Sequence, residues 1–96
     1  MAKVKTYAFD TASLLDSEEA VSVFLEDALA TNDPAFVAHA LGIAARARGM
    51  ARVARKAGLS RESLYRALST DGNPEFATVL RVIEALGLKL TIAPAE

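Results

Sequence analysis

The segment ARVARKAGLSRESLYRALS, residues 51–69, carries arginines, serines and one glutamate at short spacing. A guanidinium group can bond the O6 and N7 atoms of guanine through two parallel hydrogen bonds, and a carboxylate can accept from N4 of cytosine. Arg61 and Glu62 supply these two groups at neighbouring positions, and Arg66 lies about one helical turn further on. These residue types and this spacing predict a helix that reads the edges of DNA bases.

Other polar residues of this segment suit contacts with the DNA backbone. The hydroxyls of Ser60 and Ser63 can bond a phosphate or a base, and Tyr65 can reach a phosphate or a thymine methyl. Arg52 is expected to clamp the sugar-phosphate backbone, with Arg55 or Lys56 beside it, which sets register and affinity without reading sequence. The residues expected to contact DNA are Arg52, Ser60, Arg61, Glu62, Ser63, Tyr65, Arg66 and Ser69.

Two simpler interpretations of the charged residues stay open. The side chains of Arg46, Arg48, Arg55 and Lys56 can serve only to solvate helix faces. Glu62 can pair with Arg66 at i,i+4, a bond worth a few tenths of a kcal/mol.

A helix-turn-helix motif over residues 50–69 is expected to position these side chains. Such a motif packs two short helices at a steep angle across a turn of three or four residues. Gly58 supplies the left-handed turn conformation, and Ala54 is small where the second helix approaches. The residues expected to face inward are Val53, Ala57 and Leu59 from the first helix and turn, and Leu64 with Ala67 or Leu68 from the second.

The fold class predicted for the whole chain is all-α, with five helices and a short C-terminal strand in one domain. An acidic lead-in covers residues 1–32, and its helix starts at Asp16, with Glu19 completing a capping box. The helical core covers residues 33–87. Its first helix has Asp33 as N-cap and Pro34 at the first position and ends at Gly49. The three helices that follow are expected over residues 50–57, 60–69 and 73–87. Phe24, Phe36 and Phe76 lie on apolar stripes and are expected in the core.

The hydrophobic period changes after Gly87. Leu88, Leu90 and Ile92 alternate with polar residues, which predicts a half-buried strand over residues 88–93. A lone strand needs a partner to pair its backbone. The candidates are the N-terminal segment KVKTYAF or the same strand of a second subunit, so these three residues are the expected dimer strand.

Composition excludes several classes of protein. The 96 residues suffice for one domain, and 52% of them are apolar, as a folded protein requires. The chain has no cysteine and only one histidine, His39, so neither a metal site nor a cofactor is expected. The serines have no base to activate them, and we expect no enzyme. No apolar run reaches the length of a membrane span and no signal peptide is recognisable, so a cytoplasmic protein is expected.

Charge is strongly segregated along the chain, although the formal net charge is only −1. Residues 1–45 hold two lysines against seven acidic residues, a net charge of −5. Residues 46–66 hold seven basic residues against Glu62, a net charge of +6, and residues 67–96 carry −2. Since charges are screened over about 8–10 Å, a polyanion responds to the local basic patch.

At these residues the sequence resembles the Cro/C1-type (XRE) helix-turn-helix superfamily and, more narrowly, the addiction-module antidote proteins close to the HigA-like antitoxins. The resemblance is carried by YAFDTASLLDSEEAVSVFLEDAL, ARVARKAGLSRESLYRALS and GNPEFATVLRVIEALGLKLTI, which cover most of the chain. Arg52 stands where the superfamily often has glutamine.

The resemblance implies a homodimeric antitoxin that represses its own operon from double-stranded operator DNA. It also implies a small basic toxin partner of the RelE/ParE-like fold, a kind of toxin that commonly cuts messenger RNA. The acidic residues that could meet a cationic toxin are Glu18, Glu19, Glu26 and Asp27, with a solvated helix face as the simpler interpretation.

Two alternative functions share part of this pattern. A prophage-type transcriptional regulator would have every DNA-binding feature and no toxin, and a neighbouring gene for a small basic protein would argue against it. A helical protein-interaction module that does not bind DNA would lack the steep salt dependence that phosphate contacts give.

Overall fold

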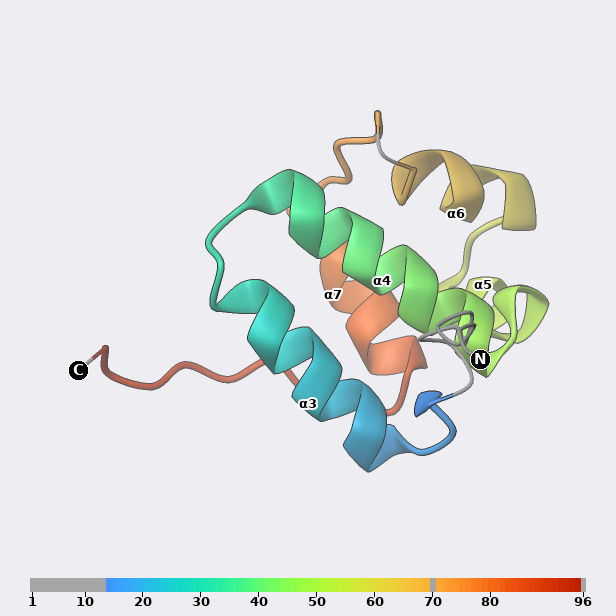
Figure 1. Ribbon diagram of the computed structural model, residues 1–96. Helices are drawn as coiled ribbons and strands as arrows, with labels where there is room; N and C mark the ends of the chain where they lie inside the picture. Colours follow the sequence, from blue (N-terminus) through green and yellow to red (C-terminus); the bar gives the residue numbers. More distant parts are fainter. Residues whose placement is uncertain (1–13, 70, 96) are drawn as a thin grey trace, which may run out of the picture.

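The computed structural model describes residues 14–69 and 71–95. This part of the chain contains α-helices and no strand, which confirms the all-α class for it (Figure 1). The helices are α3 (Glu18–Leu29), α4 (Pro34–Arg48), α5 (Met50–Ala57), α6 (Arg61–Ala67) and α7 (Phe76–Ala85).

The helices pack around α4 and α7. α3 lies against α4 and runs in roughly the opposite direction, while α7 crosses behind α4 and contacts both α4 and α5 (Figure 1). α6 packs on α5 at the end of the molecule remote from α3. The order of the helices in space therefore separates α3 from α6, while the start of α3 comes close to α5.

One apolar core connects all five helices. Its largest fully buried side chains come one from each helix: Val21, Leu41, Val53, Leu64 and Val82. Burying a side chain of this size contributes about 1.5–3 kcal/mol relative to exposure. No polar or charged residue of the described part is buried, so the core is held together by apolar packing alone.

Local signals in the sequence set the bounds of α4 and α5 as predicted. The Asp33 carboxylate accepts hydrogen bonds from the backbone N–H groups of Ala35 and Phe36 at 3.1 and 3.3 Å, and Pro34 is the first residue of α4. α4 ends at Gly49, whose φ of 102° is outside the range that other residues readily adopt. α5 begins at the next residue.

Two predicted helix starts are wrong by one to three residues. The N-cap of α3 is Ser17, whose hydroxyl accepts from the Ala20 N–H at 3.1 Å. Because a cap must directly precede the first helical residue, Asp16 is too early and no capping box with Glu19 forms. α7 begins at Phe76, since the chain stays extended through Glu75 while it passes from α6 to α7.

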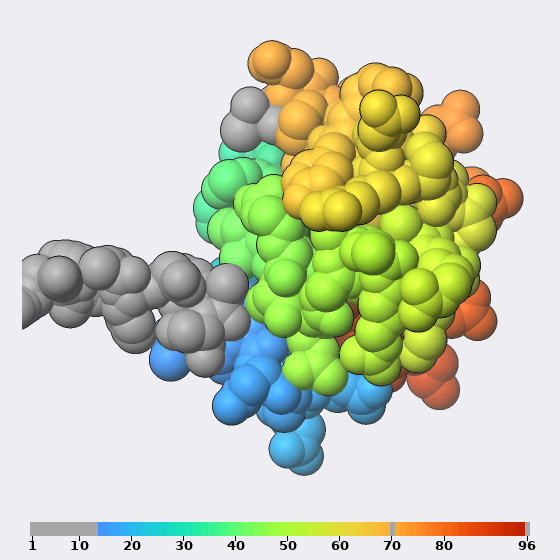
Figure 2. Space-filling view, turned by 90° about the vertical axis from the view of Figure 1, so that its right-hand side faces the viewer, coloured from blue at the N-terminus to red at the C-terminus, as the bar shows by residue number. Residues whose placement is uncertain are grey.

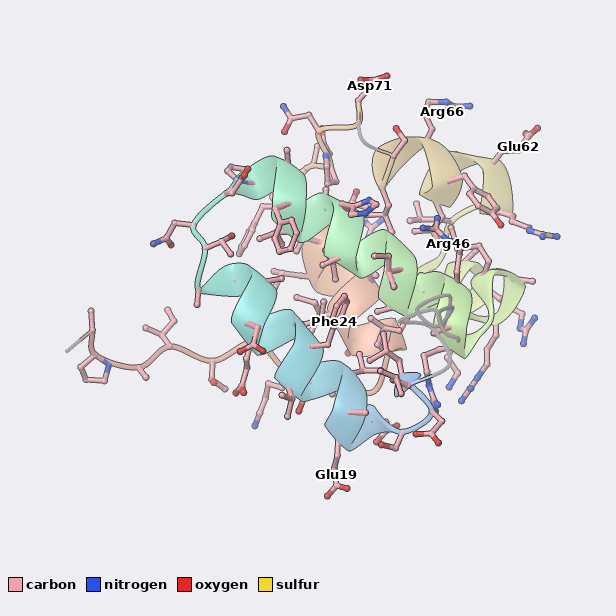
Figure 3. The ribbon with its side chains drawn as sticks, in the orientation of Figure 1. Glu19, Phe24, Arg46, Glu62, Arg66 and Asp71 are labelled. Atoms are coloured by element: carbon pink, nitrogen blue, oxygen red, sulfur yellow. The ribbon has the colours of Figure 1, made fainter. Side chains whose placement is uncertain are left out.

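The aromatic residues are less buried than their helical spacing predicted. Phe24 is partly buried against the core and points inward from α3 (Figure 3). Phe36 and Phe76 are 45% and 67% exposed, so placing these two in the core was wrong. Both lie in the first turn of their helices, α4 and α7.

The C-terminal strand is not formed in the single chain. Residues 88–95 adopt neither helix nor strand, and the tail leaves the body of the protein (Figure 1). Leu88 and Leu90 are partly buried against the core, whereas Ile92 is 97% exposed. A strand needs a second strand for its backbone hydrogen bonds. The segment KVKTYAF lies outside the described residues, and pairing with a second subunit stays a prediction.

Candidate nucleic-acid interface

The predicted motif corresponds to α5, a short turn and α6. Gly58 ends α5 in the left-handed conformation with φ 74°, and the Leu59 N–H donates to the Ala54 carbonyl at 2.9 Å. On the inner side Val53, Ala54 and Ala57 are at most 5% exposed. The turn therefore directs the chain from α5 into α6 while the contact surface between the two helices stays apolar.

α6 is anchored by two leucines one turn apart. Leu64 is fully buried and Leu68, just beyond the end of α6, is 3% exposed. Of the two alternatives left open for the second anchor, Leu68 is thus the buried residue, and Ala67 is only partly buried. These two contacts fix which side of this short helix faces solvent.

The outer side of α6 presents most of the residues expected to contact bases. Arg61, Glu62, Tyr65 and Arg66 are all exposed, and Glu62 and Arg66 point away from the body (Figure 3). The Arg61 guanidinium lies 5.8 Å from the centre of the Tyr65 ring, within range of a cation–π contact. The structure thus brings these four side chains together on one helix.

The serines at this site are engaged in local hydrogen bonds. The Ser60 hydroxyl caps α6 by accepting from the Ser63 N–H at 2.9 Å, and it donates to the Ser63 hydroxyl at the same distance. The Ser69 hydroxyl donates to the Arg66 carbonyl at 3.0 Å. Their role in this structure is to hold the two ends of α6 in place.

Arg52 belongs to a separate cluster on α5. A hollow of about 50 Å³ is lined by Arg52 and Lys56, by Arg48 at the end of α4, and by the acidic Glu18 and Glu84. In Figure 2, α5 and α6 both lie at the surface that faces the viewer. Arg52 thus lines a hollow with residues of α3, α4 and α7, and no residue of α6 lines that hollow.

Sequence reasoning gave Arg46 and Arg48 no definite place at the site. Arg48 lines the same hollow as Arg52. A Cβ at the buried Gly42 would lie 3.1 Å from the Leu68 carbonyl oxygen and 3.7 Å from a guanidinium nitrogen of Arg46. Arg46 therefore lies beside the C-terminal end of α6, where a cation is favourable for the helix dipole. The available sequence signal for the cluster of Arg48, Arg52 and Lys56 was their spacing of four residues.

The acidic residues of α3 fall into two groups. Glu19, Glu26 and Asp27 are exposed, and Glu19 points away from the body at the end opposite Glu62 and Arg66 (Figure 3). Glu18 is also exposed, but it lies against Gly87 and lines the hollow with Arg52. The structure therefore separates Glu18 from the other three acidic residues.

Residues 14–69 and 71–95 contain neither a metal-binding cluster nor a membrane-spanning helix. No group of three or more histidine, aspartate or glutamate side chains is arranged to hold a metal ion. No helix in this part of the chain is long and apolar enough to cross a membrane.

The arrangement defines a small helical protein with a basic surface on α5 and α6 and an acidic surface on α3. A family model described as "Probable addiction module antidote protein" matches residues 5–94. The chain belongs to this family, and the antidote of an addiction module implies a toxin as its partner.

A bacterial protein is also similar to this chain. The chain is 48% identical over 84 residues to an uncharacterized protein of Haemophilus influenzae, with 88% of this chain and 87% of the relative covered. No solved structure matches the chain.

Proposed function

We propose that this protein is the antitoxin of a type II toxin–antitoxin module and also a dimeric, sequence-specific DNA-binding repressor of its own operon. One observation carries the DNA-binding part. Leu64 and Leu68 hold α6 on the body from one side, while Arg61, Glu62 and Arg66 stand exposed on the other. A short helix fixed in this way on a glycine turn suits the recognition helix of a helix-turn-helix protein of the Cro/C1 type.

In this mechanism α6 enters the major groove and α5 lies across the backbone. Arg61 and Glu62, in the first turn of α6, meet base edges, and Arg66 adds a base or phosphate contact one turn further on. Arg52, with Lys56 and Arg48 from the neighbouring cluster, bonds phosphates and sets the register. The local charge of +6 over residues 46–66 attracts the DNA phosphates, which the net charge of the whole chain alone does not indicate.

For the toxin we propose a small basic protein of the RelE/ParE-like fold that binds α3. Glu19, Glu26 and Asp27 are exposed on this helix together with Val23, which is 58% exposed. An apolar side chain among carboxylates suits a cationic partner, since the charges steer association and the apolar group adds burial. Glu18, placed beside Gly87, is a weaker candidate for this contact.

Binding to DNA from the protein's own promoter region tests the repressor. Fluorescence anisotropy at several salt concentrations should give a log Kd that rises with log salt. Arg61→Ala should cost about 1–3 kcal/mol and relax specificity at one base. The control is Arg81→Ala, which removes the same charge from an exposed site on α7. Equal Kd values for the two variants, at fixed salt, would refute base reading by α6.

Binding to the protein encoded beside this chain in its operon tests the antitoxin surface. The double variant Glu19→Lys, Glu26→Lys should weaken toxin binding and flatten its salt dependence, because both charges are reversed on the proposed surface. Asp71→Lys, Glu75→Lys reverses two exposed charges elsewhere and should bind as the natural chain does. Equal affinity of both double variants would exclude α3 as the toxin contact. Toxin binding without any DNA binding would favour a protein-interaction module.

A further inference from the structure

An apolar hollow opens where the end of α3 meets the first turns of α4 and α7. We define the apolar hollow by five of its lining residues, Leu29 of α3, Pro34 and Val37 of α4, and Phe76 and Val79 of α7. It has a volume of about 310 Å³. Because a cavity of about 150 Å³ holds a benzene ring, the apolar hollow has room for at least one aromatic side chain of another molecule.

The edge of the apolar hollow is exposed, while its base belongs to the core. Phe76 is 67% exposed and Leu29 37%. Leu41 and Ile83 line the same hollow and are only 1% and 6% exposed. Large apolar side chains are costly to leave in water, so the two exposed residues favour a partner that covers them.

Two amide side chains give the apolar hollow its polar groups. Asn32, in the turn between α3 and α4, and Asn73, before α7, line the hollow and are exposed. An amide side chain both donates and accepts hydrogen bonds, and an apolar pocket with a few such groups is the usual form of a binding site. The apolar hollow therefore has the composition of a site for an apolar side chain and the backbone that carries it.

The exposed charges beside the apolar hollow are mostly acidic on the side of α3 and α4. Glu26 lies one turn before Leu29, and Asp33 directly precedes Pro34, and both carboxylates are exposed. Lys89 lines a neighbouring hollow with Glu26 and offsets part of this charge. The edge keeps a net negative charge, so it attracts a basic partner.

These charges and the position of the apolar hollow distinguish between partners. Among the described residues, no basic side chain and no residue of α5 or α6 lines the hollow, so it lacks the phosphate contacts that DNA requires. A second copy of the chain would bring the same acidic edge to this site, and like charges at an interface are unfavourable. The antidote of an addiction module requires a toxin, and a basic toxin meets neither obstacle.

The apolar hollow continues the toxin surface proposed on α3. Glu19, Val23, Glu26 and Leu29 follow one another at spacings of four, three and three residues, which places each about one turn beyond the last on the helix surface. All four are exposed, and the last of them lines the hollow. A partner that lies along this side of α3 therefore reaches the hollow.

From these observations we infer that the toxin inserts a large apolar side chain into the apolar hollow. That side chain packs on Phe76 and Leu29, and basic residues beside it on the toxin face Glu26 and Asp33. This inference rests on the proposed antitoxin function and deepens it, because it adds an apolar pocket on α4 and α7 to the contact proposed on α3.

Toxin binding by the full chain tests this contact. Phe76→Ala should raise the Kd for the protein encoded beside this chain in its operon by at least about 30-fold, because aromatic side chains at the centre of an interface are frequent hot spots. The matched control is Phe36→Ala. It removes the same side chain from the first turn of α4, where Phe36 is 45% exposed and does not line the hollow.

Phe36→Ala should bind the toxin as the natural chain does. Both variants should keep the salt dependence of the natural chain, because neither removes a charge. Circular dichroism would verify that both are folded. Equal Kd values for Phe76→Ala and Phe36→Ala would overturn the inference.

Photo-cross-linking identifies the molecule that enters the apolar hollow. The chain has no cysteine, so Asn73→Cys places a single thiol at the hollow for a benzophenone label. Arg81→Cys places the same label at an exposed position of α7 outside the hollow. In the presence of the toxin, Asn73→Cys should cross-link to an apolar segment of the toxin, and Arg81→Cys should not. Equal toxin yields from the two positions, or a product between two copies of this chain, would overturn the inference.

These tests separate the inference from the proposed function. If the natural chain binds the toxin and Phe76→Ala binds it as well as Phe36→Ala does, the apolar hollow is not part of the contact, and the antitoxin function stands. If the natural chain does not bind the toxin at all, the proposed antitoxin function fails and the inference fails with it.

Discussion

Replacing Leu64 by alanine tests how α6 is held on the body of the protein. α6 has seven residues, and an isolated helix of this length is not stable in water, so it depends on its buried side chains. Leu64 is fully buried, and a Leu→Ala change at such a site costs about 2–5 kcal/mol. With about 3 kcal/mol lost, and roughly 4–8 °C of Tm per kcal/mol for a domain of this size, Tm should fall by roughly 12–24 °C.

Thermal and urea unfolding followed by circular dichroism measure this loss, at one protein concentration because a dimer's stability depends on it. The matched control is Tyr65→Ala on the same helix. Tyr65 is 40% exposed and touches Arg61 through its ring, so its removal should cost less than about 1 kcal/mol. If the two variants unfold within about 0.5 kcal/mol of each other, Leu64 does not anchor α6 and the orientation of the basic side chains loses its physical basis.

Four further variants test the turns, the cap and the phosphate contact. Gly72→Ala would drive a Cβ into backbone carbonyls at the end of α6. It should lower Tm by more than Gly58→Ala, because a Cβ at Gly58 meets open space and only the left-handed conformation costs about 1–2 kcal/mol there. Equal losses of Tm for the two variants would contradict this expectation. Ser60→Ala removes the cap bond to the Ser63 N–H and should cost about 1 kcal/mol in urea unfolding, and an unchanged midpoint would count against the cap. Arg52→Ala should weaken binding to all DNA sequences alike and reduce the salt slope by about 1, whereas a loss confined to one sequence would assign it to base reading.

The predictions that succeeded depend on signals within a few residues. Asp33 before Pro34, and the glycines at residues 49 and 58, set the ends of α4 and α5, because capping and left-handed backbone are local properties. Ser17 instead of Asp16 caps α3, since two adjacent residues both have side chains able to cap. Only the backbone conformation, extended at Ser17, decides between them.

The predictions that failed depend on distant parts of the chain or on other molecules. Phe76 continues the apolar stripe of α7, yet it is largely exposed, because it borders an open hollow between the first turns of α4 and α7. The strand at Leu88–Ile92 needs a partner that a single chain does not supply. The different surroundings of the acidic residues of α3 also depend on contacts between distant parts of the chain. Glu18 and Glu19 are neighbours in sequence, but only Glu18 lies against Gly87.

That contact makes the start of α3 a boundary between two surfaces of opposite charge. A carboxylate at residue 18 moderates the field of the three cations that line the same hollow, at the end of α4 and along α5. A protein that drew α3 toward itself would leave those cations less compensated and more attractive to phosphate.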